Sequence, residues 1–400
     1  MSIPGWLQQR LTAAGGRVPF LLFMEWALHD PEHGAYGAGR LRIGRQGDFA
    51  TAPSLGGEFA ALLAPQIAQW LRELAPGEPA ATLSLVEAGP GEGDLSLQLA
   101  MALAAGWPAL AARTELVLVE PNAGMVARQR QRLKDCPLPV RWSGFEPLAA
   151  QPVQGVVLAH EVLDALAVER IVRVGDGWRR QCVALQQGAL RLEPGELLEP
   201  SLAAALQPLG LWPPGEQRPA GWCTELHPGL APWLAACGRS LRRGRLLVID
   251  YALEAWRYYA PQRANGTLMA YRGQRASSDP LADPGAWDLT AHLCIDSLLA
   301  AAVASGWTAL GQRRQGEALL ALGLAQRLHG LQQRDAGVLA DLLSRREALL
   351  RLVDPAALGD FRWLAFARGA AAAAAEPPLF LAEPLAASAA TGTAAPPSTA

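Results

Sequence analysis

Apolar and polar residues along this chain follow two alternating patterns. Short apolar runs at 83–87, 115–119 and 156–159 lie among segments at 94–105 and 122–133 where apolar residues recur three or four apart. Strand-like runs that alternate with helical periodicity predict an α/β fold with a parallel sheet and right-handed crossovers. The pattern resumes near residue 229 and predicts helices at 229–240, 293–305, 317–330 and 335–350, and strands at 245–251, 307–313 and 361–367.

Three regions depart from this pattern. Polar and apolar residues alternate one by one within about 167–225, which predicts an inserted antiparallel segment. Residues 1–78 contain helical patterns around a long loop with five glycines, and loops of that length are usually functional or disordered. Because this loop contains His, Tyr, Asp and Phe, we expect an ordered binding loop. Residues 369–400 are mostly Ala, Pro, Ser and Thr, which predicts a disordered tail after the main domain at 79–368.

The segment LSLVEAGPGEGDLSLQL at 83–99 carries the strongest chemical signal. A strand ends at Glu87, and Gly89, Gly91 and Gly93 precede a helix. This arrangement brings a ligand against bare backbone at the carboxyl end of a parallel strand. Glycine permits a positive φ there and lacks the Cβ that would hold the ligand away. The next predicted strand ends in Glu120, where a carboxylate can bind ribose hydroxyls.

The charge of this turn bears on the kind of nucleoside that it binds. The third glycine falls one residue early for a dinucleotide motif, and no Lys–Ser/Thr pair follows as in a phosphate-binding loop. Glu87, Glu92 and Asp94 disfavour a pyrophosphate, which needs free backbone amides without nearby anions. A cationic nucleoside such as S-adenosylmethionine (SAM) is compatible with them. The alternative interpretation is an acidic surface turn that binds no ligand.

A second group of polar residues, HEVLDAL at 160–166, follows the predicted strand 156–159. Glu161 and Asp164 are three residues apart and lie on one face if the segment forms a helical turn. Paired carboxylates could hold a guanidinium or orient an amine for attack on a methyl group. Equally, they could serve only the N-terminus of the following helical turn.

Three further clusters combine polar and aromatic residues. Asp48 could contact a ligand that Phe49 covers, unless Asp48 bonds only its own turn. The others are Asp250 with Tyr251 at the end of a predicted strand, and Asp288, Thr290 and His292 before a predicted helix. For both clusters the alternative explanation is that these residues only cap the element that follows. No set of His, Cys and carboxylate residues has metal-ligand spacing.

Composition excludes several classes of partner and site. A net charge of −2 and a pI near 6.3 give no overall positive field for nucleic acid or an anionic membrane. Five scattered cysteines without CxxC spacing disfavour disulfides and zinc sites and suit a reducing cytoplasm. No apolar run has membrane-spanning length, and the N-terminus lacks a secretory signal pattern. We therefore expect a cytoplasmic protein without a metal site, nucleic-acid binding or membrane insertion.

The motifs between Phe20 and Ala367 resemble, in order, those of the MidA-like SAM-dependent methyltransferases. That family includes a mitochondrial arginine methyltransferase that assists respiratory complex I assembly. The motifs are HGAYG, IGRQGDFATAPS, VEAGPGEGDL, LVEPN, AHEVLDAL, TELHP, VIDYA, NGTLMAYR, DPGAWDLTAH, QGEALLALGLAQR and LGDFRWLAF. The resemblance implies a seven-stranded class I, Rossmann-like methyltransferase sheet with an N-terminal lid. It also implies bound SAM and methyl transfer to a protein nitrogen, expected to be that of an arginine.

Matched position by position, the resemblance suggests a role for each candidate residue. It places Glu87, Gly89, Gly91 and Gly93 at the methionine end of the cofactor, and Glu120 on the ribose. It puts Asp48 and Phe49 in the lid, and Glu161 and Asp164 at the acceptor as catalytic residues. His160 replaces the Asn that the family has between cofactor and acceptor. The chain also departs from the family pattern at Val162, Leu163, Ala167, Ala252, Cys294 and Ile295.

Two other functions remain open at this point. The chain could methylate a small amine, or it could bind SAM as an assembly chaperone with weak or no turnover. The expected partner is a protein substrate such as a subunit of a respiratory complex, and the chain could form a homodimer.

Overall fold

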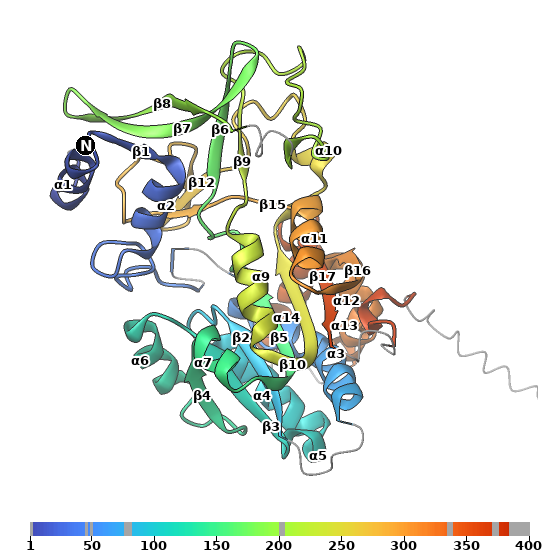
Figure 1. Cartoon of the computed structure of the whole chain (residues 1–400). Coiled ribbons are helices and arrows are strands. Elements are labelled where there is room, and N and C mark those ends of the chain that lie inside the picture. Colours follow the sequence, from blue (N-terminus) through green and yellow to red (C-terminus); the bar gives the residue numbers. More distant parts are fainter. Residues whose placement is uncertain are drawn as a thin grey trace, which may run out of the picture.

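A seven-stranded sheet forms the centre of the computed structural model, which describes residues 3–44, 47–48, 51–75, 82–199, 205–333, 339–369 and 376–383 (Figure 1). Its strand order is β16 (Thr308–Arg314), β17 (Arg362–Arg368), β10 (Leu241–Asp250), β5 (Val153–His160), β2 (Leu83–Ala88), β3 (Thr114–Val119) and β4 (Val140–Ser143). β17 is antiparallel to β10 and β16, whereas the other neighbours are parallel. The predicted fold class, a seven-stranded Rossmann-like sheet, is confirmed.

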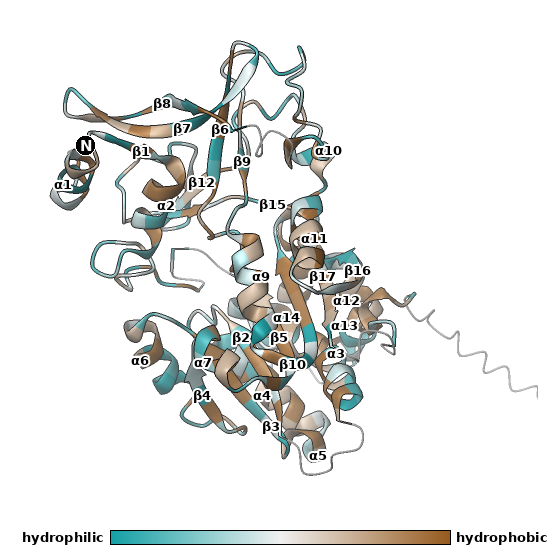
Figure 2. Ribbon diagram, viewed as in Figure 1, coloured by the Kyte–Doolittle hydropathy of each residue, from teal (hydrophilic) through white to brown (hydrophobic). Residues whose placement is uncertain are grey.

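Helices cover both faces of this sheet, which explains why its strands are almost continuously apolar. On one face lie α3 (Glu58–Leu74), α4 (Asp94–Gly106), α12 (Gln315–Ala321), α13 (Leu324–Gln332) and α14 (Leu339–Val353). On the other lie α7 (Phe145–Ala150), α9 (Leu230–Arg239) and α11 (Ile295–Ala304). Adjacent strand residues such as Leu85 and Val86 pack into opposite cores. The central strands are accordingly apolar in Figure 2.

One predicted helix, 317–330, is wrong as a single element. The structure divides it into α12 and α13 at Gly323, whose φ is +96°. A left-handed glycine ends one helix and lets the chain begin the next in a new direction.

A second lobe lies beside the carboxyl ends of the central strands (Figure 1). It contains α1 (Gly5–Ala13), α2 (Phe20–His29) and β1 (Arg17–Pro19), which pairs with the predicted antiparallel insertion. The insertion consists of β6 (Glu169–Val174), β7 (Gly177–Gln186), β8 (Ala189–Leu197) and β9 (Cys223–Leu226).

This lobe contains a further sheet that the sequence pattern does not predict. The sheet comprises β12 (Met269–Arg272), β13 (Arg275–Ser277) and β14 (Asp288–Thr290). Shorter elements close by are β11 (Ala252–Leu253), α10 (Ala255–Tyr258) and β15 (Leu293–Cys294). Asp288 and Thr290, weighed above as helix caps, therefore lie in a strand.

The packing does not follow the predicted boundary at residue 78. α2 packs with β6, β7 and β14 of the second lobe, whereas α3 is buried in the core of the central sheet. The predicted boundary rests on a change in sequence pattern. Such a change does not show which of two hydrophobic cores a helix packs into.

The prediction of a disordered tail does not hold for residues 376–383. They include the short 3-10 helix η5 (Leu379–Leu381), whose Phe380 is buried against Trp70 and Trp363. Residues 370–375 and 384–400 of the predicted tail lie outside the described residues.

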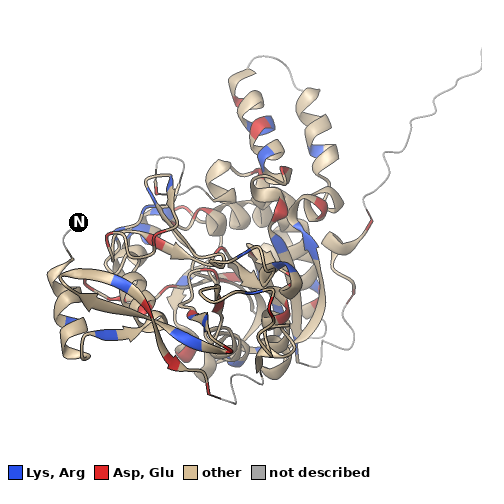
Figure 3. Cartoon of the chain, turned by 90° about the horizontal axis from the view of Figure 1, so that it is seen from above, with Lys and Arg blue, Asp and Glu red and all other residues tan. Residues whose placement is uncertain are grey.

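The remaining described elements are α5 (Pro108–Ala111), α6 (Ala123–Arg132), η1 (Ala52–Leu55) and η3 (Leu358–Asp360). Within the described part of the chain, no helix combines the length and apolarity that a membrane span requires. Basic and acidic residues are interspersed over the fold (Figure 3).

Candidate functional site

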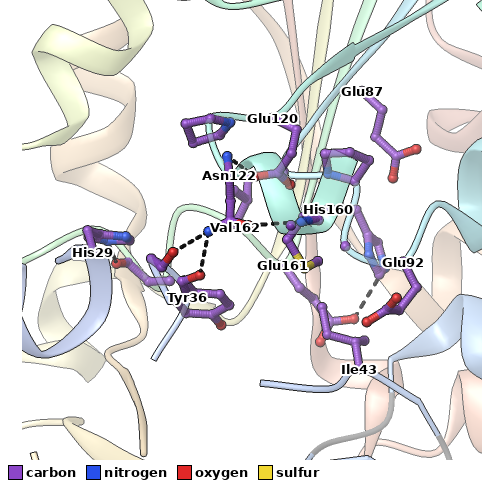
Figure 4. A pocket seen from close by; sticks show the side chains of 18 of the residues that line it. His29, Tyr36, Ile43, Glu87, Glu92, Glu120, Asn122, His160, Glu161 and Val162 are labelled. Atoms are coloured by element: carbon purple, nitrogen blue, oxygen red, sulfur yellow. Dashed lines mark hydrogen bonds and ion pairs between the residues drawn. The ribbon is translucent and has the colours of Figure 1, made fainter. Parts of the chain in front are cut away.

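A cavity of about 860 Å³ lies at the carboxyl ends of β2, β3 and β5. The parallel sheet continues from β2 outward through β3 on one side and β5 on the other. Such a switch point is where open α/β sheets bind ligands. Figure 4 shows His29 and Tyr36 from the second lobe on one side of the pocket, and Glu87 and Glu92 on the other.

The three glycines of the turn after β2 all have positive φ, at +61° for Gly89, +53° for Gly91 and +86° for Gly93. A Cβ on Gly89 would collide with the side chain of Val162, and one on Gly91 would lie 2.9 Å from Ile43 Cδ1. The prediction of glycine for a positive φ is correct. The missing Cβ atoms also make room for Val162 and Ile43, which bring the 160–166 segment and the 30–44 loop onto this turn.

Glu87 is buried beside the turn and lines the cavity. Its carboxylate accepts a hydrogen bond from the Ser96 hydroxyl in α4. Burial raises the pKa of Glu87 to about 8, and the charge of Asp94 adds to the shift. A cation bound at this end of the cavity would favour the ionised carboxylate.

Glu120 also lines the cavity, at the end of β3. It accepts hydrogen bonds from the Asn122 backbone at 2.8 Å and from Gln129 Nε2 at 3.1 Å. Burial raises its pKa. These bonds fix the carboxylate at the position where the sequence predicts contact with a ribose.

The side chains of Asn122 and Arg128 hold the loop after α2 beside the cavity. The sequence patterns did not predict a role for either residue. Asn122 Nδ2 donates to the backbone oxygens of Tyr36, at 3.1 Å, and Gly37 (Figure 4). Arg128 pairs with Glu92 at 3.0 Å and reaches the Gly39 carbonyl. Asn122 belongs to the motif LVEPN and Tyr36 to HGAYG. Both motifs therefore contain residues of this contact, but neither motif alone shows that the two residues meet.

The structure does not bring Asp48 to the cavity. Its carboxylate accepts hydrogen bonds from the backbone N–H groups of Arg42, at 2.9 Å, and Gly273, at 3.0 Å. The Asp48 carbonyl also accepts from the Gln274 backbone N–H at 2.8 Å. Asp48 therefore joins this loop to the β12–β13 hairpin rather than to a ligand. Phe49 lies outside the described residues.

His160 ends β5 and lines the cavity in a buried position. Its ring packs against Phe59, with 5.2 Å between centroids. Burial lowers the pKa of His160 to about 3, so the imidazole is neutral at physiological pH. The ring lies at the cavity beside Glu161, and its expected place between cofactor and acceptor stays a prediction.

Glu161 follows directly and has a φ of +52°, which is unusual for a residue with a side chain. Its carboxyl accepts a hydrogen bond from the Ala52 backbone N–H. The other oxygen, Oε1, lies 3.4 Å from His160 Nε2 and has no hydrogen-bond partner. Burial and the charges of Asp164 and Asp288 raise the pKa of Glu161 well above its usual value. Strained backbone and an unpaired buried carboxylate indicate a functional position.

Asp164 lies on the same loop as Glu161 but is not among the residues that line the cavity. Its Oδ2 accepts a hydrogen bond from the Thr290 hydroxyl at 2.7 Å. Burial raises its pKa even though Thr290 and nearby backbone N–H groups favour the ionised form. The structure thus brings Glu161 and Asp164 together as predicted, but on a tight loop rather than one turn of a helix.

Asp250 holds this loop in place, a role that sequence reasoning did not assign. Its Oδ2 accepts from the backbone N–H groups of Leu163, at 3.1 Å, and Asp164, at 3.3 Å. Burial, with the charges of Asp164 and Glu161, raises its pKa well above the usual value. No group of three or more His, Cys, Asp or Glu residues among the described ones could hold a metal ion.

The cavity fits a nucleoside that carries positive charge. Glu87 and Glu120 supply two carboxylates at the ends of neighbouring strands, and Ile43, Leu95 and Met125 supply apolar lining. The raised pKa of Glu87 reflects a buried carboxyl that lacks a cationic partner of its own. These observations agree with a sulfonium nucleoside bearing an amino group.

Comparison with known proteins gives one matching family model. It is described as "Putative S-adenosyl-L-methionine-dependent methyltransferase" and matches residues 62–313. Curated relatives include the mitochondrial protein arginine methyltransferase NDUFAF7 homolog of Drosophila melanogaster, 28% identical over 90% of this chain and 83% of that protein. The Xenopus tropicalis protein of the same name is 26% identical over 79% of this chain and 74% of that protein.

Among solved structures, a Burkholderia thailandensis protein bound to S-adenosyl-homocysteine is 31% identical, with a TM-score of 0.79. The match covers 90% of both chains.

Proposed function

Because this chain belongs to the family of SAM-dependent methyltransferases that its family model describes, we propose that it methylates an arginine side chain of a protein substrate. The family, the enzyme class and the cofactor predicted from the sequence are confirmed. The arginine acceptor is the proposal, and the names of the curated relatives support it.

The cavity residues have distinct tasks toward the cofactor. Glu87 would hold the ammonium group, Glu120 the ribose hydroxyls, and the backbone of Gly89 and Gly91 would allow close approach. When bound, SAM supplies an electrophilic methyl group on a sulfonium.

One observation carries the arginine assignment: Glu161 and Asp164 form a largely buried acidic pair at the cofactor cavity that has no arginine or lysine partner. Among the ion pairs of the described residues, none joins an arginine or lysine to either carboxyl. Two carboxylates can bind a guanidinium through several of its N–H donors at once, which a lysine ammonium matches less well.

The chain's own contribution to the reaction is orientation and proton transfer. Glu161 and Asp164 would hold the guanidinium so that one nitrogen faces the donor, which removes the entropic cost of bringing two reactants together. Their raised pKa values suit them to accept the proton that the methylated nitrogen releases. The 30–44 loop, tied by Asn122, would exclude water from the cavity.

Replacement of Glu161 tests this function. We expect Glu161→Gln to lower turnover at least a hundredfold while the SAM dissociation constant changes less than threefold, because the residue acts on the acceptor. Transfer of labelled methyl groups to protein in a lysate that lacks the gene would measure turnover, and calorimetry would measure SAM binding. Glu146→Gln, at an exposed glutamate of α7, is the matched control. Normal turnover in the Glu161 variant would contradict the role.

The same lysate experiment separates the alternatives. Labelled protein whose label resides in methylarginine supports the proposal. Label that appears only in small molecules would indicate a small-amine methyltransferase, and SAM binding without any labelled product would indicate an assembly chaperone. As partner and location we propose a respiratory-complex or other assembly subunit in the cytoplasm, which identification of the labelled protein and cell fractionation would test.

A further inference from the structure

The sheet of β12, β13 and β14 turns one face toward the acceptor loop. Asp288 and Thr290 are two residues apart in β14 and therefore point to the same side. The antiparallel register pairs Asp288 with Tyr271 of β12, and directly paired residues share a face. Since Thr290 donates to Asp164 at 2.7 Å, this face carries Asp288 and Tyr271 toward the same acidic pair.

Asp288 is buried, with 5% of its surface exposed, and its Oδ1 has no hydrogen-bond partner. Its carboxyl is hydrogen-bonded to the Tyr36 hydroxyl, and Tyr36 lines the cofactor cavity. Glu161 Oε1 on the acceptor loop is the second buried carboxylate oxygen without a partner in this region. Unpaired buried carboxylate oxygens are costly, so a ligand that donates N–H groups to both oxygens would stabilise them.

The cluster lacks a cation of its own. None of the ion pairs within the described ranges joins an arginine or lysine to Glu161, Asp164, Asp250 or Asp288. The raised pKa values of Glu161 and Asp288 reflect burial first and then the neighbouring negative charges. The described residues form no group that could hold a metal ion there. An organic cation therefore matches the site.

Aromatic side chains near the cluster indicate that the cation is planar. The charges of the cluster act on three of the chain's five tyrosines, Tyr36, Tyr251 and Tyr271. Tyr251 is 36% exposed and stacks on His292, with 5.5 Å between ring centroids, so it lies where the cluster meets the surface. A planar guanidinium can contact aromatic faces and donate hydrogen bonds from its edges.

We propose that Asp288 and Tyr271 form the second wall of the acceptor site, opposite Glu161, and bind the planar cation of an arginine side chain that enters past Tyr251. This inference rests on the proposed function, and it adds a specificity-determining carboxylate that the paired residues Glu161 and Asp164 do not provide. β14 would thus hold Asp164 through Thr290 and the substrate through Asp288.

A bisubstrate probe tests this proposal without knowledge of the substrate protein. The probe is S-adenosyl-homocysteine whose sulfur position bears a guanidinoalkyl chain, and its counterpart bears an aminoalkyl chain. Calorimetry measures the dissociation constants of both probes and of S-adenosyl-homocysteine. For the unaltered chain we expect the guanidino probe to bind at least tenfold more tightly than S-adenosyl-homocysteine and than the amino probe.

Three variants then locate the gain in affinity. Asp288→Asn and Tyr271→Leu should each lose at least three quarters of the gain on a logarithmic scale, whereas S-adenosyl-homocysteine should bind them within twofold of the unaltered chain. The latter measurement shows that a variant is folded. Asp283→Asn is the matched control, because Asp283 lies shortly before β14 in the chain, is exposed and pairs with Arg272 at 2.6 Å.

The outcomes distinguish this proposal from the proposed function. If the guanidino probe gains nothing over S-adenosyl-homocysteine in the unaltered chain, the guanidinium acceptor itself is refuted. If it gains affinity and both Asp288→Asn and Tyr271→Leu retain the gain, the acceptor is a guanidinium but the second wall is refuted. Loss of the gain in Asp283→Asn as well would also overturn the assignment, since that change lies outside the site.

Discussion

At the scale of single residues, Glu87 makes a pH-dependent contribution to cofactor binding. Burial raises its pKa to about 8, so the carboxyl is mostly protonated in the free protein at pH 7. An ammonium group bound beside it favours the ionised form, and binding must then release a proton. We predict that SAM affinity rises with pH toward about 8, by up to about tenfold per pH unit.

Calorimetry at several pH values, in buffers with different ionisation enthalpies, measures both the affinity and the released proton. Glu87→Gln should bind SAM about tenfold or more weakly and should lack this proton release. The amino group of SAM titrates in the same range, and the Gln variant retains that titration as an internal reference. Equal pH dependence in the two proteins would show that Glu87 does not contact the ammonium group.

The positions of many site residues at the cavity could be predicted from the sequence, because they depend only on where each strand ends. Glu87 and Glu120 lie at the ends of two neighbouring strands and Gly91 in the turn after the first, and the ends of parallel strands meet at one edge. Asp48 differs because its partner, Gly273, is 225 residues away. In the sequence, Asp288 and Asp250 stand out only as polar residues. Their roles could not be predicted, because these depend on contacts across the fold.

At the scale of elements, the 30–44 loop and the start of α6 act as one unit through Asn122. The Asn122 side chain accepts from the Met125 backbone as the N-cap of α6, and its amide group donates to the Tyr36 and Gly37 carbonyls. Ser and Asp can replace the capping oxygen but not the two amide donors. Asn122→Ser and Asn122→Asp therefore remove the loop contact and preserve the cap.

We predict that both variants release SAM about tenfold faster, with a melting temperature of the free protein within about 2 °C of the original. Stopped-flow displacement of bound cofactor measures the rate. Agreement between a neutral and a charged replacement separates loss of the contact from repulsion by nearby Glu120. Dissociation within twofold of the original in both would mean that these hydrogen bonds do not hold the loop over the cofactor.

The elements of the central sheet were largely predictable, and the small sheets were not. β2 and β5 are apolar on both faces, so their pattern does not depend on other parts of the chain. β12, β13 and β14 have three or four residues each, too few for a period to be distinguished from a loop. Their strand character arises from pairing with one another and from packing against α2.

At the scale of the whole molecule, the active-site cavity lies between two bodies with different cores. One body is the central sheet, whose strand ends present Glu87, Glu120 and Glu161. The other contains α1, α2 and the sheet of β14, with a core of its own. Thr290 and Asp164 join the two bodies at the acceptor loop, so an arginine side chain bound as proposed above would contact both.

The C-terminal segment extends the core on the side of the sheet that α3 covers. Phe380 is fully buried, and its ring meets Trp70 of α3 at 6.5 Å and Trp363 of β17 at 5.5 Å between centroids. The Phe380 backbone N–H also donates to Gln66 of α3 at 3.1 Å. The segment therefore connects a helix and a strand that are almost 300 residues apart in the chain.

We predict that Phe380→Ala lowers the free energy of unfolding by about 3–5 kcal/mol, the usual cost of a large cavity in a core. Denaturant titration measures this loss. Leu379→Ala is the matched control, because Leu379 is 37% exposed and should cost less than about 1 kcal/mol. Phe380 is not among the residues that line the cavity, so SAM affinity per folded molecule should stay within twofold. Equal, small losses in both variants would mean that η5 is not part of the core, whereas a large loss of SAM affinity would mean that the C-terminal segment supports the site as well.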